Sequence, residues 1–450
     1  MKMRLIIVLA FTIFTVPAIA ADSNVLPTLT LDQAHDLALK NHPQIAAANY
    51  RALAAQEAVK EARSQFFPQA NLYGSAVGAD SKDTRIEAGG LNNPSVFNRA
   101  AGGLGVTQLI TDFGRTANLT ASSRFQAQAA NQNANATREQ VLLNVDASYF
   151  GTLQAQAVMN VARQTVDTRQ LLLDQVTLLA SNKLKSELDV SFAKVALGQG
   201  QLLLQRAQND FDASQAALST ALGFREFHPF NLIETSPRVL GNTNDISSLI
   251  DTALQYRPEI LALTDERDGS QRLARAQRDA RLPTLAAVGV AGASPIHDDR
   301  LPDNYAAGGI QLSLPLFAGG LYVARQHEAE LRANADSELL RSLEDNIIRD
   351  VRIAWLNLNN ARERLRTAEE LVNEANQAFE LAQARYKVGS SSIVELSQAQ
   401  LQLTSAQIDE TTARYDVLMQ EANLNYQIGG LSPRSRTGLP TNPAGAVRRQ

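Results

Sequence analysis

Two long stretches without proline constrain the fold of this chain more than any other feature. Residues 95–228 and 316–432 contain no proline, and Gly389 is the only glycine in residues 321–428. Because proline and glycine are the residues that most often interrupt helices, each stretch predicts a long helix, a turn and a second long helix. A helix over residues 116–182 would extend about 100 Å, which is far longer than a compact globular core requires.

The second stretch carries an apolar pattern with the period of a coiled coil. From Val351 onward its apolar positions are separated by three and four residues in turn, and large and small side chains alternate along it. The positions are Leu343, Ile347, Val351, Ala354, Leu358, Ala361, Leu365, Ala368, Val372, Ala375, Phe379, Ala382 and Tyr386. This 3.5-residue period favours a helix that packs along a partner helix over its whole length. A buried helix in an ordinary bundle is the alternative.

The chain also repeats itself. Residues 41–45 (NHPQI) align with residues 256–260 (YRPEI) at a separation of 215 positions, and further on residues 147–150 (ASYF) align with 353–356 (IAWL) at a separation of 206. The decrease from 215 to 206 places a longer variable loop in the first copy. Each copy therefore predicts a helix, a short strand, a variable loop, a second strand and a long helical hairpin.

These patterns divide the chain into two repeats joined by a linker. The first repeat covers residues 21–223, with strands near 70–78 and 103–110 and a helical hairpin near 116–223. A linker over residues 224–245 leads to the second repeat, residues 246–429, with strands near 284–292 and 308–315 and a hairpin near 320–429. The variable loops fall within residues 78–99 and 292–304. A tail over residues 430–450 is rich in Pro, Ser and Arg, and we expect it to be flexible.

The N-terminus has the pattern of a secretory signal peptide over residues 1–20. Lys2 and Arg4 precede an apolar run, and Ala18-Ile19-Ala20 forms an A-x-A cleavage site. Removing the two basic residues leaves 40 basic and 46 acidic residues, a net charge near −6, which argues against nucleic-acid binding. The chain has no cysteine, and its five histidines show no ligand spacing, so we expect no metal or other cofactor. No run of 18 apolar residues follows, so any segment in a membrane must be β-strand.

The order of these elements and three short segments resemble TolC-type outer-membrane efflux proteins. The segments are residues 29–34 (LTLDQA), residues 316–320 (LFAGG) and residues 384–396 (ARYKVGSSSIVEL). The resemblance implies a mainly helical homotrimer with a small β part: a 12-strand barrel in contact with outer-membrane lipid, and an α-helical barrel in the periplasm. It further implies a passive exit duct of a tripartite efflux or type I secretion system, joined through a periplasmic adaptor protein to an inner-membrane pump. Such a protein is not an enzyme and binds no cofactor.

The resemblance also indicates candidate functional residues at the two helical turns. The adaptor would dock at the second turn, and less strongly at the first, through Tyr386, Gly389, Ser390, Ser391, Ser392, Asn182 and Lys183. The family usually has glycine at both turns, whereas Lys183 stands at the aligned position of the first turn. Asn182 lies beside it, and because asparagine tolerates the left-handed conformation better than most residues, we still expect a turn there.

Asp189 and Glu395 occupy the same repeat position, early in each return helix. In a trimer they would supply six carboxylates around one axis, and we predict that they form a cation-selective gate at the periplasmic end. The alternative is that both are solvated acids favoured by the helix dipole.

Two other functions are compatible with an exported coiled-coil protein. A periplasmic adaptor normally carries one helical hairpin flanked by β-rich domains, whereas this chain predicts two hairpins and little strand outside them. A structural stalk without channel activity is the second alternative.

Overall fold

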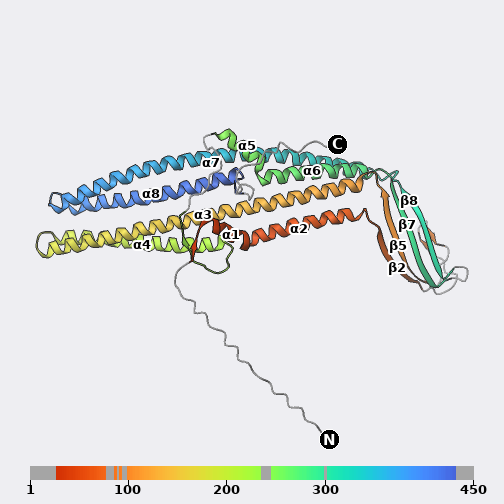
Figure 1. The fold of residues 1–450 in the computed structure, drawn as a ribbon, viewed down its shortest axis with the longest axis horizontal. Coiled ribbons are helices and arrows are strands. Elements are labelled where there is room, and N and C mark those ends of the chain that lie inside the picture. The colour runs from red at the N-terminus through yellow and green to blue at the C-terminus, as the bar shows by residue number, and fades with distance from the viewer. Residues whose placement is uncertain are drawn as a thin grey trace, which may run out of the picture.

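The computed structural model describes residues 27–77, 86–88, 91–93, 99–234, 245–297 and 302–431. The molecule is elongated, with a β-sheet at one end and two helical hairpins that extend side by side to the other (Figure 1). The expected signal peptide, nearly all of the tail and part of the linker lie outside the described residues.

The helices of the two halves have the same order and the same lengths, 11, 22, 67 and 35 residues. The first half contains α1 (Leu31–Asn41), α2 (Pro43–Ser64), α3 (Arg115–Ser181) and α4 (Glu187–Ala221). The second half contains α5 (Ile246–Tyr256), α6 (Pro258–Asp279), α7 (Leu321–Lys387) and α8 (Ile393–Gln427). Pro43 and Pro258 stand at the first position of their helices, where a missing N–H leaves no helical hydrogen bond unmade.

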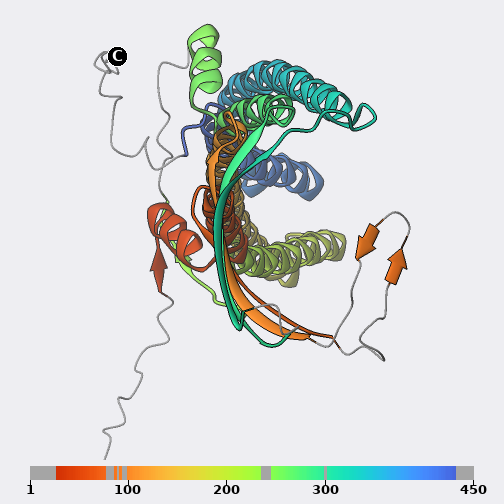
Figure 2. The same cartoon turned by 90° about the vertical axis from the view of Figure 1, so that its right-hand side faces the viewer.

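Each half contributes one β-hairpin to a shared antiparallel sheet. Its strands are β2 (Gln69–Val77), β5 (Arg99–Thr111), β7 (Thr284–Ile296) and β8 (Asn304–Ser313). Their order is β2-β5-β7-β8, so the β5–β7 pair joins the two halves and β2 and β8 form the edges. Seen along the long axis of the molecule, the sheet is strongly curved (Figure 2). A small hairpin of β3 (Ile86–Ala88) and β4 (Leu91–Asn93) lies between β2 and β5 in the sequence.

The two faces of this sheet differ in chemistry. Strand register places four large apolar side chains on one face: Leu72, Leu104, Ile310 and Leu312. Leu72 is 85 % exposed and Ile310 72 % exposed. On the opposite face the ring of Tyr305 covers Gly103 and Gly292, where an added Cβ would lie only 2.4 and 2.5 Å from the tyrosine oxygen. One face is therefore apolar and open, and the other is filled by tyrosine over glycine.

Strand β7 is longer than the sequence indicated. It continues past residue 292 through Pro295 to Ile296, which pairs with Ala100 of β5, so the second loop begins later than expected. Proline is tolerated there because the end of a strand has fewer ladder bonds to make. His297 Nε2 lies 2.6 Å from Asp303 Oδ1, beside the second loop.

The linker also contains a strand that the sequence did not indicate. Within it, β6 (Asn231–Leu232) pairs in parallel with β1 (Thr28–Leu29). The hydroxyl of Tyr149 on α3 lies 2.9 Å from the carbonyl oxygen of Leu29 and 2.5 Å from that of Ile233, on the two sides of the pair. Such short strands depend on contacts with a helix that is distant in the sequence.

The coiled-coil pattern of the second half lies in the core. Most of its positions are buried: Ile347, Val351, Ala354, Leu358, Ala361, Ala368, Ala375, Ala382 and Tyr386. Helix α7 packs along α8 and α6, and α3 packs along α4, α6, α2 and α8.

None of the helices in the described ranges has both the length and the apolar character needed to cross a membrane.

Candidate functional site at the helical tips

The first hairpin closes through a left-handed lysine. Lys183 has φ of 63°, and its N–H donates to the carbonyl of Ala180 at 2.8 Å. The N–H of Leu184 donates to the carbonyl of Leu179 at 2.9 Å. This pair of bonds is the Schellman motif, which satisfies the last carbonyls of α3. Asn182, which we expected to favour the turn, has φ of −89° and caps the helix instead.

The second hairpin closes with the same backbone through glycine. Gly389 has φ of 78° and its N–H donates to Tyr386 at 3.1 Å, while Ser390 donates to Arg385 at 2.9 Å. A left-handed conformation costs a residue with a side chain about 1–2 kcal/mol and costs glycine almost nothing. The two tips therefore share a geometry, but only the first carries strain.

Asp189 caps the return helix of the first hairpin. Its side chain accepts hydrogen bonds from the backbone N–H and the hydroxyl of Ser186, at 2.9 and 2.8 Å, and Ser186 in turn accepts from the Asp189 N–H. This reciprocal capping box holds the carboxylate, which is half-buried, at the start of α4.

Glu395 stands at the same position of the second hairpin but has a different partner. Ser392 caps α8 by accepting from the Glu395 N–H at 3.2 Å, and the Glu395 carboxylate accepts from Arg385 at 2.8 Å. This pair joins the last turn of α7 to the first turn of α8. Glu395 thus carries an exposed but paired charge.

The remaining turn residues of the second tip present polar groups to solvent. Gly389, Ser390 and Ser392 are exposed, and Ser391 is half-buried. The Ser390 hydroxyl donates to the carbonyl of Arg385 at 3.1 Å. An added Cβ at Gly389 would meet nothing within 4 Å, so the glycine is required for its backbone angle and not for space.

Tyr386 lies between the two tips rather than on the surface. It is 5 % exposed and packs in a cluster with Val176 of α3 and Val190 of α4. The ammonium of Lys185 lies over its ring, 3.9 Å from the centroid. Burial and then the nearby Asp189 carboxylate raise the pKa of the Tyr386 hydroxyl. Among the described residues this hydroxyl has no hydrogen-bond partner.

Sequence reasoning missed the contact that joins the tips. Lys185 follows the first turn within two residues, but nothing in the local sequence indicated that a cation there would meet Tyr386. Lys185 and Tyr386 are about 200 residues apart in the chain, and near the tips α3 and α4 pack on α8 of the other half. A cation over a tyrosine face stabilises such a contact by about 0.5–1 kcal/mol when exposed.

The tips present charged and polar groups, such as the carboxylates of Asp189 and Glu395 and the hydroxyl of Ser390. Within the described part of the chain, no three His, Cys, Asp or Glu side chains are placed to hold a metal ion.

Comparison with known proteins places this architecture in one family. The sequence matches the family described as "Outer membrane efflux protein" over residues 34–224 and 249–430. The chain belongs to this family. The resemblance noted from the sequence is thereby confirmed.

Individual relatives agree with the assignment over nearly the whole chain. The outer membrane protein TolC of Vibrio cholerae is 25 % identical over 427 residues, which cover 93 % of this chain and 95 % of the relative. The solved structure of CusC superposes with a TM-score of 0.77 at 17 % identity, covering 89 % of this chain and 92 % of that one. The CmeC outer membrane channel of Campylobacter jejuni gives a TM-score of 0.73 at 19 % identity, with 89 % and 86 % covered.

Membership of this family also gives the location and the general role of the protein. It is an outer-membrane exit duct of efflux systems that extends into the periplasm. The family is one of channels and not of enzymes.

Proposed function

We propose that three copies of this chain form a closed duct, with a 12-strand barrel in the outer membrane and a helical tunnel below it. The open, curved sheet of four strands carries this proposal. Its edge strands β2 and β8 leave unpaired backbone groups, which is unstable in water or lipid unless a neighbouring strand covers them. Three such sheets supply twelve strands, more than the eight of the smallest membrane barrels.

The chemistry of the two sheet faces supports the same arrangement. The open apolar face, with Leu72 and Ile310 most exposed, fits contact with outer-membrane lipid. The tyrosine face would line the lumen. Outward apolar and inward polar side chains alternate in the same way along membrane barrel strands.

The helices extend the duct into the periplasm. The equal lengths of the corresponding helices support an internally duplicated subunit, with one hairpin from each repeat. Three copies would place six hairpins around one axis. Their tips would then form the periplasmic end of the tunnel.

At that end we place the gate and the docking surface. Asp189 and Glu395 are the gate acids of the two hairpins. The exposed turn of Gly389, Ser390 and Ser392 is the stronger surface for a periplasmic adaptor, which links the duct to an inner-membrane pump. Lys183 offers a charged and weaker surface beside it.

Cysteine cross-linking tests the trimer, because the chain has no cysteine of its own. Ser75→Cys on β2 is combined in turn with Ala307→Cys, Gly309→Cys and Gln311→Cys on β8, which share its sheet face and sample neighbouring registers. One combination should give a covalent trimer on a non-reducing gel after export to the outer membrane.

The matched control pairs Ser75→Cys with Glu187→Cys, an exposed position at the far end of the molecule, and should give no cross-linked trimer. A monomeric mass in mild detergent together with no cross-link in any combination would refute the shared barrel.

A further inference from the structure

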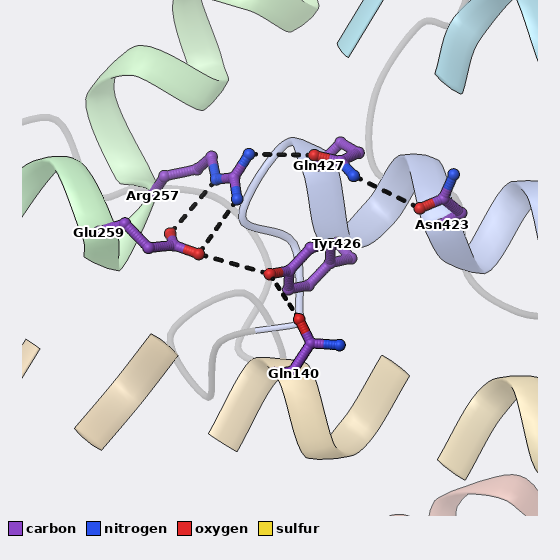
Figure 3. Close-up of polar contacts among 6 residues, drawn as sticks. All are labelled: Gln140, Arg257, Glu259, Asn423, Tyr426 and Gln427. Atoms are coloured by element: carbon purple, nitrogen blue, oxygen red, sulfur yellow. Dashed lines mark hydrogen bonds and ion pairs between the residues drawn. The ribbon is translucent and has the colours of Figure 1, made fainter. Parts of the chain in front are cut away.

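The two halves of the subunit meet in a polar junction far from the tips, where α3, α6 and α8 come together (Figure 3). Arg257, at the start of α6, donates to both carboxylate oxygens of Glu259 at 3.3 and 3.1 Å. It also donates to Gln427 of α8 at 3.0 Å. The hydroxyl of Tyr426 lies 3.0 Å from Gln140 Oε1 of α3 and 3.4 Å from Glu259 Oε1. Each of the six side chains drawn makes at least one of these polar contacts.

Glu139, the neighbour of Gln140 on α3, is buried beside this junction. It is 2 % exposed, and its Oε1 atom is buried with no hydrogen-bond partner in the described structure. The charged and titratable groups that act on it are Arg257 and Glu259 of α6, with Tyr426 of α8 beside them. An ionised carboxylate that is buried without a hydrogen bond is costly, and a neutral carboxyl is much less so.

We propose that Glu139 is a proton-binding site that couples the closure of the junction between α3, α6 and α8 to pH. The proton is bound while the junction is closed and is released when the junction opens to water.

Charge balance at the junction favours a proton over a metal cation. Two carboxylates, Glu139 and Glu259, stand beside one guanidinium, so a single proton makes the cluster neutral. A divalent cation would lie against Arg257 and would have to displace its two bonds to Glu259. Proton uptake needs no rearrangement.

The direction of the pH effect follows from the environment of Glu139. Burial, followed by repulsion from Glu259, raises its pKa from 4.5 to about 8, and Arg257 opposes this only in part. Between pH 4.5 and about 8, the closed junction therefore holds one more proton than the open junction. Closure is therefore most favoured below about pH 4.5. The closed-to-open ratio then falls by up to about tenfold per pH unit until the pH passes about 8, where the effect is lost.

The other repeat has no such group. The position aligned with Glu139 is Asp345, which is exposed, and those aligned with Arg257 and Glu259 are His42 and Gln44. Asp345→Asn is accordingly a matched control, since it makes the same chemical change at the equivalent place.

Hydrogen exchange of the full-length protein in mild detergent tests the proposal. Protection of residues 136–143, 257–262 and 423–428 is followed from pH 6 to 9.5, after correction for base-catalysed exchange. In the wild type, protection should fall about tenfold between pH 7 and 9. Glu139→Gln should give protection that is independent of pH, and Asp345→Asn should behave like the wild type. A wild type without pH dependence, or a Glu139→Gln variant that follows it, overturns the proposal.

Two further measurements separate protonation from a general loosening of the fold. Glu259→Gln removes the repelling charge and frees Arg257, so the transition should move to lower pH; movement to higher pH contradicts the charge assignment. Infrared difference spectra should show the carbonyl band of a protonated carboxyl at pH 6 in the wild type and not in Glu139→Gln. If both proteins lack this band, Glu139 does not hold the proton.

Discussion

The two helical tips of this protein have nearly the same backbone and different side-chain chemistry. Both close α-helices of equal length with a Schellman motif, but the left-handed position is Lys183 in the first tip and Gly389 in the second. Asp189 of the first tip is engaged in a capping box, whereas Glu395 of the second is paired with Arg385 across the turn. The same backbone thus accepts different residues. The first tip carries the strain of a left-handed lysine, and the second carries an ion pair across its turn.

The largest effect is expected from replacing the glycine. Gly389→Val places a β-branched residue at φ of 78° and should destabilise the second tip by at least about 1–2 kcal/mol. Export by cells carrying the variant should fall, while the amount of protein in the outer membrane stays unchanged. Gly198→Val, in the middle of helix α4 at an open position, is the control for a general loss of packing. Unchanged export in Gly389→Val would mean that docking does not depend on this turn.

The reverse change at the first tip should stabilise it. Lys183→Gly removes the cost of a left-handed lysine. The free energy of local opening of residues 179–186, measured by hydrogen exchange, should rise by about 1 kcal/mol. Lys194→Gly, an exposed lysine inside α4, should instead destabilise, because glycine is unfavourable in a helix interior. Equal effects of the two substitutions would contradict the asymmetry between the tips.

The smallest effect is expected at the two proposed gate acids, because the charge of each is already partly compensated by its neighbours. Replacing both residues, Asp189→Asn with Glu395→Gln, should reduce the preference of reconstituted channels for cations by about twofold. Reversal potentials in a salt gradient measure this preference. Asp167→Asn, an exposed acid on α3 away from the tips, is the control. If the reversal potential is the same in all three proteins, the two acids are solvated surface groups and the gate lies elsewhere.

Local patterns in the sequence were sufficient to predict much of the helical architecture. The spacing of residues such as Ala354, Leu358 and Ala361 identified the buried face of α7, because helical periodicity is a property of adjacent turns. The absence of proline likewise indicated where α3 runs without interruption, and the absence of both proline and glycine did so for α7. The same reasoning placed Gly389 at a turn, since its left-handed conformation is set within one helical end.

Features that join distant parts of the chain could not be predicted in this way. The extension of β7 to Ile296 depends on pairing with β5, almost 200 residues earlier. The partner of Lys185 is Tyr386, and the burial of Glu139 requires α6 and α8. By their local sequence alone, Lys185 and Glu139 look like ordinary surface residues.

The sequence by itself determined the elements of this protein, their repeated order and their family, because these depend on periodicity and on interruptions along the chain. Only the tertiary structure decided which charges are buried, which acid pairs with which base, and which face of the sheet is apolar and open. The physical reason is that burial and pairing energies arise between side chains brought together by packing, and their positions in the sequence carry no trace of that proximity.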